Sequence, residues 1–252
     1  MKSPTTIQPP RAAWAGVQIL ALATTLGMLA VGTPTLSAAG NPNPGIAPIN
    51  SKPHGKSYSQ WATAWWQWVF SIPTDVNPLL DPTGEHADQG QQGPVWFLAG
   101  NFGGETVRAV CVPTGKSLFF PILNQPWVQF PEDPPDTIPE LRAILRPGMD
   151  HATLYCEIDG RPVKDLAGYR EESAVFTTTV PDDNLLGLPA GDYEPCVDNG
   201  YYLMLKPLKP GRHTIRFMAV NADQSFSLDV TYILTVQQPL PSQEKSCTSR
   251  KL

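Results

Sequence analysis

The sequence predicts a mainly β protein, an antiparallel β-sandwich of immunoglobulin-like or jelly-roll type with an N-terminal tryptophan-rich helix and one short inserted helix. Short runs that alternate between apolar and polar residues recur between Val95 and Val236. The 28 prolines are spread along all 252 residues, and this favours many short elements over long helices. Helical spacing with a start signal occurs in only two stretches, 57–72 and about 138–146.

The first 39 residues have the pattern of a secretory signal peptide. Lys2 and Arg11 precede an apolar run over 12–31, and small residues follow that place a cleavage site between Ala39 and Gly40. The alternative is a retained anchor, because a run of about 20 apolar residues can span a bilayer. We expect cleavage, and therefore a secreted or periplasmic protein with no stable membrane span.

The rest of the chain is predicted to form one domain with an extension at each end. Residues 40–56 are rich in proline, asparagine and glycine and are expected to form a flexible linker. The single β-sandwich domain is expected over 57–238, and a polar, disordered tail over 239–252. The net charge of −5 leaves no basic surface for nucleic acid, so no nucleic-acid partner is expected.

The tryptophan-rich helix is predicted to pack into the core. Ser57 and Gln60 form a capping box, and Pro73 ends the helix. One face carries apolar residues at spacings of 3, 4, 3 and 4, namely Tyr58, Trp61, Trp65, Trp68 and Ile72. Sugar stacking and membrane-surface binding are the alternatives, but a membrane-surface helix usually carries Lys or Arg and 57–72 has none. Trp66 lies off this face, so we keep it as a ligand-binding candidate together with Trp96 and Trp127.

The strand pattern begins at Val95. The stretch 95–113 is expected to form a hairpin that turns at Gly103 and Gly104. The next run, 116–124, contains Pro121, which indicates an edge strand or a bend.

After this run, Thr137 and Glu140 form a capping box for the second helix, and Gly148 is expected to end it. Asp159 and Gly160 predict a two-residue hairpin turn.

The last part of the chain contains the clearest strand signal. The residues from 225 to 236 alternate without a break, as expected for a strand with one buried face. By contrast, the segment "CVDNG" at 196–200 has the composition of a turn.

One acidic loop is the candidate metal site. Asp81, Glu85 and Asp88 lie together in "DPTGEHAD" with His86 between them, and calcium prefers oxygen ligands on an adaptable backbone. The spacing does not match an EF-hand, and a solvated acidic loop is the alternative. No cofactor is expected otherwise. The chain has no G-x-S-x-G, H-E-x-x-H, P-loop or Rossmann pattern. The sequence therefore favours a protein without catalytic activity over an enzyme.

Four cysteines in an exported chain allow three disulfide pairings. Cys247 lies in the polar tail, where a partner cysteine would be close only by chance. The pair Cys156 and Cys196 is the preferred pairing.

Seven phrases of the sequence resemble a family of bacterial exported proteins of uncharacterised function. They are "SYSQWATAWWQW", "NPLLDPTG", "GPVWFLAGNFGG", "VPTGKSLFFPILN", "LPAGDY", "GYYLMLKPLKPGRHTIRF" and "DVTYILTV", and they cover about 57–236. The resemblance implies export and an all-β body, but no activity or catalytic residue. Relatives often have a cysteine before the G-Q-x-G-P-V-W stretch that can pair with the one matching Cys111. Here the region reads "EHADQGQQGPVW", without that cysteine.

Together these observations predict an exported, non-catalytic binding or envelope-associated protein whose partner is a small molecule or a glycan. The alternative is a secreted jelly-roll hydrolase or cyclase assisted by calcium. A binding protein should have a groove lined by one of the three candidate tryptophans, with no carboxylates converging on it. An enzyme should have a deep pocket where at least two acids or histidines of the acidic loop meet.

Overall fold

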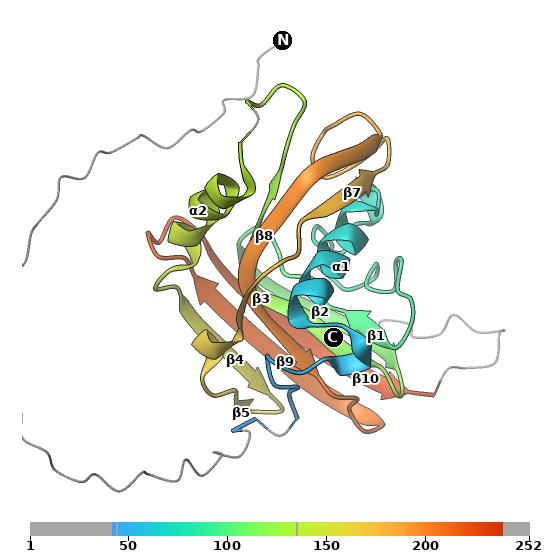
Figure 1. Cartoon of the computed structure of the whole chain (residues 1–252). Helices are drawn as coiled ribbons and strands as arrows, with labels where there is room; N and C mark the ends of the chain where they lie inside the picture. Colours follow the sequence, from blue (N-terminus) through green and yellow to red (C-terminus); the bar gives the residue numbers. More distant parts are fainter. Residues whose placement is uncertain (1–41, 44, 135, 239–252) are drawn as a thin grey trace, which may run out of the picture. The chain divides into compact units, whose positions relative to one another are not determined.

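The computed structural model describes residues 42–43, 45–134 and 136–238 (Figure 1). The predicted signal peptide, its cleavage site between Ala39 and Gly40, and the predicted tail 239–252 lie outside these residues. Within the described part of the chain, no helix combines the length and the apolar character needed to cross a membrane.

Two α-helices and ten strands make up the described chain. The helices are α1 (Tyr58–Phe70) and α2 (Ile138–Met149), with short 3-10 turns at Pro53–Gly55, Thr74–Val76 and Leu166–Tyr169. The strands are β1 (Val95–Phe97), β2 (Gly104–Pro113), β3 (Ser117–Val128), β4 (Thr153–Ile158), β5 (Arg161–Pro162), β6 (Arg170–Glu172), β7 (Phe176–Val180), β8 (Gly191–Leu205), β9 (Gly211–Val220) and β10 (Ser227–Gln237).

The strands form two five-stranded sheets. Sheet A has the order β1-β3-β8-β6, with β7 also pairing with β8, and sheet B has the order β2-β10-β9-β4-β5. The prediction of a mainly β chain is confirmed. The prediction that all strands pair antiparallel is wrong for two pairs, because β1 runs parallel to β3 and β2 runs parallel to β10.

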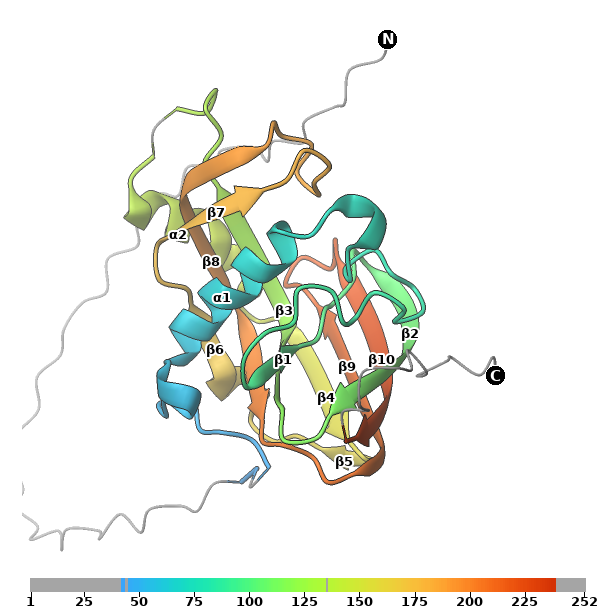
Figure 2. The same ribbon diagram turned by 90° about the vertical axis from the view of Figure 1, so that its right-hand side faces the viewer.

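Sheet A lies between α1 and sheet B. Figure 2 shows α1 crossing in front of β3, β6 and β8. On the other face, Phe120 of β3 stacks on Phe217 of β9, with ring centroids 5.4 Å apart. Because both faces of sheet A are covered, β8 is buried at every residue from Cys196 to Leu205, in contrast to the alternating burial of β10.

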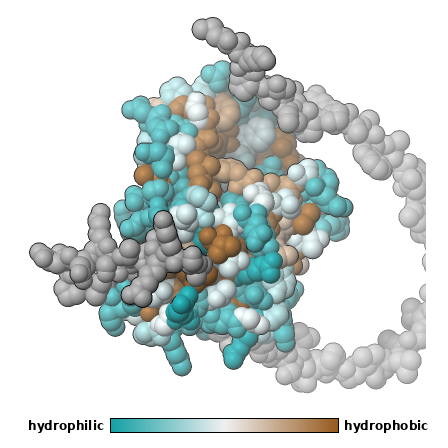
Figure 3. Space-filling model, turned by 180° about the vertical axis from the view of Figure 1, so that it is seen from behind, coloured by the Kyte–Doolittle hydropathy of each residue, from teal (hydrophilic) through white to brown (hydrophobic). Residues whose placement is uncertain are grey.

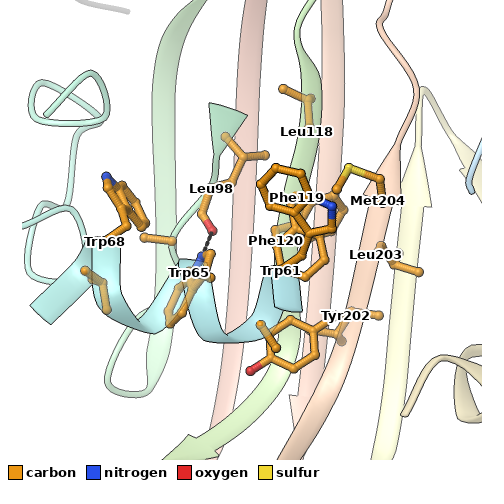
Figure 4. Close-up of a cluster of buried hydrophobic side chains, with 14 of the residues drawn as sticks. Trp61, Trp65, Trp68, Leu98, Leu118, Phe119, Phe120, Tyr202, Leu203 and Met204 are labelled. Carbon is orange, nitrogen blue, oxygen red and sulfur yellow. Dashed lines mark hydrogen bonds between the residues drawn. The ribbon is translucent and has the colours of Figure 1, made fainter. Parts of the chain in front are cut away.

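The tryptophan-rich helix packs into the core, as predicted. The capping box is present, since Ser57 Oγ accepts a hydrogen bond from the backbone of Gln60 and the Gln60 side chain accepts one in return. The indoles of Trp61, Trp65 and Trp68 are buried among residues of β1, β3 and β8 (Figure 4). Each buried indole removes roughly 150–250 Å² from water, which fixes a helix that is too short to be stable alone.

The predicted hairpin over 95–113 is not formed. The chain turns at Gly103 and Gly104, which both have positive φ, but β1 joins sheet A and β2 joins sheet B. The glycines therefore mark a crossing between the two sheets. Alternation along the sequence cannot distinguish this from a hairpin, because both need the same turn residues.

Pro121 marks a bend in β3. The alternative, an edge strand, applies only to the part of β3 that extends past β1. The register of β3 against β8 shifts between Pro121 and Leu123, as in a β-bulge. On its other side, β3 pairs with β1 only over Ser117–Phe119. Pro121 therefore falls just beyond the last ladder contact with β1, where its missing N–H is tolerated.

The predictions of the second helix and of the turn at Asp159 agree with the structure, except for the point where the helix ends. Helix α2 begins with the Thr137–Glu140 capping box but continues through Gly148 to Met149. The Asp159–Gly160 turn joins β4 and β5, and both of its residues have positive φ.

The described part of the predicted flexible linker 40–56 packs against the domain, so this prediction is wrong there. Ile46 forms an isolated β-bridge with Leu205 and is 2% exposed. The Tyr58 hydroxyl donates to the carbonyl of Ala47 at 2.6 Å and accepts from the backbone of Met204 at 3.1 Å. The buried residues Asn43, Ile46 and Ala47 and these hydrogen bonds hold a segment whose composition suggested disorder.

The preferred disulfide between Cys156 and Cys196 is also wrong. Both are free thiols and fully buried, Cys156 in β4 of sheet B and Cys196 in β8 of sheet A. Each side chain instead fills core volume as a small apolar group.

Candidate ligand-binding site

A cavity of about 420 Å³ lies where α1, β3 and the turn between β9 and β10 meet. Its volume falls in the range of about 300–1,000 Å³ that is typical of small-molecule sites. It is lined by Trp65, Trp66, Phe70, Leu79, Gly100, Asn101, Phe102, Pro121, Ile122, Leu123, Asn124, Gln125, Pro126, Met149, Leu185, Leu186, Asn221, Ser225, Phe226 and Leu228.

The short strand β1 accounts for the position of the cavity. β1 ends at Phe97, and after Leu98 the chain leaves β3 and forms one wall through Gly100–Phe102. The opposite wall is Pro121–Pro126, a continuous stretch of β3. Consecutive residues of a strand face opposite sides, so a continuous lining stretch indicates that the cavity runs along the edge of β3 that β1 leaves uncovered.

The cavity has an aromatic and apolar wall with no ionisable Asp, Glu, His, Lys or Arg side chain. Phe102 stands at its rim and is 63% exposed, the highest value among the large apolar side chains of the described chain. On the face seen from behind in Figure 3, most of the described residues are teal or white, and brown residues gather in the middle and upper parts of this face. The aromatic and aliphatic side chains of the cavity wall favour ligands with a large apolar surface.

Two of the lining amides are already occupied by their own turns. Asn101 donates to the carbonyl of Gly104 at 3.1 Å and accepts from the backbone of Gly103 at 2.9 Å. Asn221 likewise donates to Ser225 and accepts from the backbone of Phe226, both at 3.0 Å. These side chains shape the rim, and their hydrogen-bonding atoms have partners without a ligand.

Beneath the cavity wall lies a buried polar network centred on the Tyr202 hydroxyl. It donates to Asp198 Oδ2 at 2.6 Å. It also accepts from the Trp66 indole nitrogen and from Asn124 Nδ2, both at 3.2 Å. Trp66 and Asn124 line the cavity, while Asp198 and Tyr202 are fully buried behind them. The network thus connects the cavity wall to a buried carboxyl group.

Burial raises the pKa of Asp198 to about 7, although hydrogen bonds from Tyr202 and Trp66 and the positive charge of Arg142 act in the opposite direction. Its second oxygen, Oδ1, is buried without a hydrogen-bond partner among the described residues. Burial also raises the pKa of Tyr202, and the neighbouring Asp198 adds to this effect. The hydroxyl of Tyr202 therefore stays protonated at neutral pH, and its hydrogen is used in the bond to Asp198.

The sequence pattern did not identify Asp198. Its segment, 196–200, was expected to be a turn, but it lies inside β8. Gly200 has a different role: a Cβ atom there would lie 2.6 Å from Cβ of Asn124, so glycine permits the close approach of β3 and β8. The long apolar run that follows the segment was the available signal that the strand extended through it.

Of the three candidate tryptophans, the structure places only Trp66 at the cavity. Trp96 of β1 is buried elsewhere, and Trp127 packs with α2 against Leu141 and Leu145. The indole nitrogens of Trp96 and Trp127 are buried and have no hydrogen-bond partner within the described chain. These two rings contribute to packing at a distance from the cavity.

The acidic loop does not bring its carboxylates together. Asp81 is buried, and its carboxylate accepts hydrogen bonds from the backbones of Thr83, Gly84 and His86 at 2.8–2.9 Å. These bonds lower the pKa of Asp81 despite its burial.

The two other acids of the loop, Glu85 and Asp88, are exposed. Among the described residues, no three His, Cys, Asp or Glu side chains are close enough to hold a metal ion.

Arg108 supports the cavity rim and was not singled out from the sequence. It is 1% exposed, and its guanidinium donates to the carbonyls of Asp81, Ala99 and Gly100 at 2.7–2.8 Å. The hydroxyl of Tyr232 accepts a further bond at 2.8 Å. Its position in the strand pattern indicated its burial. Arg108 precedes Val110 and Val112 of β2 at two-residue intervals, and alternate residues of a strand lie on the same face, here the inward one.

A second hollow, of about 530 Å³, lies beside the docked segment that contains Ile46. It is lined on the other side by the β4–β5 hairpin, including Asp159 and Arg161, and has no aromatic ring in its wall. It lacks the buried polar network of the first cavity.

Comparisons with known proteins identify no family for this chain. No protein-family model matches the chain, and no curated protein matches it. One similar solved structure is that of PbICP-C in complex with falcipain-2, with 13% sequence identity and a TM-score of 0.26. The match covers 57% of this chain and 100% of that chain. A TM-score this low supports no statement about fold type or function.

Proposed function

We propose that the protein is an exported, non-catalytic β-sandwich protein that binds a small organic molecule in the cavity beside β3. The observation that carries this proposal is the composition of the cavity wall, which combines aromatic and aliphatic side chains with amides and has no acid or base. General acid–base catalysis needs at least one titratable group within hydrogen-bonding reach of the substrate. A wall of this kind suits binding without chemistry.

A small molecule fits the cavity better than a glycan. Sugar recognition by stacking requires an open aromatic face, but Trp66 is only 6% exposed. Its ring stacks on Phe70 with centroids 4.9 Å apart and meets the edge of Trp65 at 4.8 Å. These neighbours occupy the surface that a pyranose ring would need.

The alternative of a calcium-assisted hydrolase or cyclase receives no support from the described residues. It required two members of the acidic loop to meet in a deep pocket. Neither Asp81 nor His86 lines the cavity, and Asp81 has its oxygens occupied by the loop backbone.

Export and the sandwich type belong to the same proposal. Export rests on the signal-peptide pattern and on the family resemblance described above. The sandwich type is supported by the core that the two sheets share, where Phe120 of sheet A stacks on Phe217 of sheet B. The parallel pairing of β2 with the last strand, β10, favours an immunoglobulin-like arrangement over a jelly-roll.

Binding can be tested with N-phenyl-1-naphthylamine, a neutral probe whose fluorescence rises in apolar sites. We expect the full-length protein to increase its fluorescence saturably. Leu186→Arg, in the cavity wall on a surface loop, should reduce this binding by roughly tenfold or more because a charged side chain then enters an apolar space.

The matched control is Ile144→Arg, at a side chain that is 47% exposed on α2 and outside the cavity wall. This variant should bind the probe as the unaltered protein does. Absence of saturable binding, or an equal effect of both arginines, would contradict the proposed function.

A further inference from the structure

We infer that the cavity selects an uncharged ligand that presents a hydrogen-bond donor, such as a hydroxyl or an amine N–H, to the side-chain oxygen of Asn124. This inference rests on the proposed binding function and names the chemistry of its ligand. It is carried by the direction of each hydrogen bond in the network around Tyr202.

The absence of ionisable side chains from the cavity wall determines the preference for an uncharged molecule. A charged ligand would lose its hydration on entering the cavity without gaining a counter-ion, and this disfavours its binding. The buried carboxyl of Asp198 behind the wall makes a second negative charge less favourable still. An anionic ligand is therefore the least suitable of all.

The hydrogen-bond directions follow from what each group can do. An indole nitrogen can only donate, so the bond between Trp66 and Tyr202 uses the tyrosine oxygen as an acceptor. Above pH 7, where Asp198 is ionised and can only accept, the single hydroxyl hydrogen of Tyr202 points to its Oδ2 at 2.6 Å, a distance typical of a bond to a carboxylate. No hydrogen of Tyr202 remains for a third partner.

Asn124 must therefore approach Tyr202 as a donor. Its Nδ2 lies 3.2 Å from the Tyr202 oxygen, and the opposite orientation would bring two oxygens together with no hydrogen between them. The amide orientation of Asn124 is thus set by Asp198 through Tyr202. Its Oδ1 is left as an acceptor on a residue of the cavity wall.

Asn124 is also the only inner amide of the wall with an acceptor to spare among the described residues. Asn101 and Asn221 use their oxygens within their own turns. Gln125 is exposed and stands at the rim. Among the side-chain amides of the wall, the oxygen of Asn124 is therefore the acceptor that we assign to a ligand donor in the interior of the cavity.

Three related probes test separately the preference for an uncharged ligand and the preference for a ligand with a hydrogen-bond donor. N-phenyl-1-naphthylamine is neutral and has one N–H, its N-methyl derivative lacks that hydrogen, and 8-anilinonaphthalene-1-sulfonate adds a negative charge. They are titrated against the full-length protein at pH 8. We expect the N-methyl derivative to bind about fivefold to tenfold more weakly than the N–H probe, and the sulfonate roughly 100-fold more weakly.

Asn124→Leu removes the acceptor while keeping the number and branching of side-chain heavy atoms, and it should abolish the preference for N–H over N-methyl. Gln125→Leu, the neighbouring amide on the same strand, is the matched control and should keep the preference. Circular dichroism of both variants verifies their fold. The comparison of the three probes on the unaltered protein does not depend on either variant.

The outcomes distinguish this inference from the proposed function. If the probes bind but the N–H and N-methyl compounds bind equally, or the sulfonate binds as well as the neutral probes, the inference is wrong and the binding function stands. If Gln125→Leu rather than Asn124→Leu removes the preference, the assignment to Asn124 is wrong. If no probe binds, the proposed function fails and the inference fails with it.

Discussion

The indole nitrogen of Trp65 donates a hydrogen bond to the backbone carbonyl of Leu98, at 3.0 Å (Figure 4). This bond joins the middle of α1 to the point where the chain leaves β1 and starts the cavity wall. Trp65 is fully buried, and its ring also meets the edges of Trp66 and Trp68. One side chain thus connects the helix, the sheet and the cavity.

Replacing this ring should destabilise the whole domain. We expect Trp65→Ala to lower the free energy of unfolding by about 3–5 kcal/mol, because it leaves a large cavity and an unpaired Leu98 carbonyl. Trp65→Phe keeps part of the ring and should cost less. Urea denaturation followed by circular dichroism measures both, and an unchanged midpoint for Trp65→Ala would contradict the core position of this helix.

Asp198 should make stability depend on pH in a specific direction. Its folded pKa is raised to about 7, so below its unfolded value the group is neutral in both states and costs nothing. As the pH rises toward 7, the unfolded chain loses the proton first and becomes relatively more favourable. The folded protein therefore loses stability, on the order of 3–4 kcal/mol, between about pH 4 and pH 7.

Asp198→Asn should remove this particular dependence because the amide stays neutral. The variant is expected to gain stability relative to the unaltered protein as the pH rises from about 4 to 7, with a constant difference above that range. Denaturant unfolding at a series of pH values measures the difference. A difference that does not vary with pH would show that Asp198 is not held neutral by burial.

The loop at Asp81 should depend on its carboxylate for backbone hydrogen bonds. In Asp81→Asn one oxygen becomes an amide that faces the N–H of His86, so two donors meet. We expect a loss of about 1–3 kcal/mol in unfolding free energy. The matched control, Glu85→Gln, neutralises an exposed acid of the same loop and should change the thermal midpoint very little. Equal effects of the two substitutions would contradict the structural role of Asp81.

The two buried thiols should be unreactive in the native protein. Burial raises the pKa of Cys196 to about 12 and that of Cys156 further, so neither forms a reactive thiolate at neutral pH. We expect an aromatic disulfide reagent to label these cysteines only after denaturation. Cys156→Ser and Cys196→Ser should each remove one of the thiols that are labelled in the denatured protein. Rapid labelling of either cysteine in the folded chain would show that its site is open.

The features that the sequence predicted well are those decided by neighbouring residues. The helix from Tyr58 depends on a capping box and a 3.6-residue period, and the turn at Asp159 depends on two residues that tolerate positive φ. Burial of the tryptophans follows from the same period, since one stripe of a helix must face the core.

The features that the sequence missed depend on contacts between distant residues. Tyr202 lies four residues after Asp198 on β8, but nothing near either residue indicates that Trp66 will join them, because Trp66 reaches the Tyr202 hydroxyl only when α1 packs on β8. The docking of Ile46 against Leu205 is equally remote in sequence. The segment at 103–104 shows the same limit, because a turn motif specifies a change of direction and not the sheet that the next strand will join.

The three-residue length of β1 has a consequence for how this protein could diversify. Beyond Phe119, β3 has no ladder partner on that side among the described residues, and its backbone there borders the cavity instead of another strand. Lengthening β1 by a few residues would extend the ladder across this space and seal it, whereas changes in the Gly100–Phe102 segment would reshape the entrance without disturbing the sheets. Substitutions in the Gly100–Phe102 segment alone could therefore change which ligand is bound, whereas a longer β1 would be enough to eliminate the cavity.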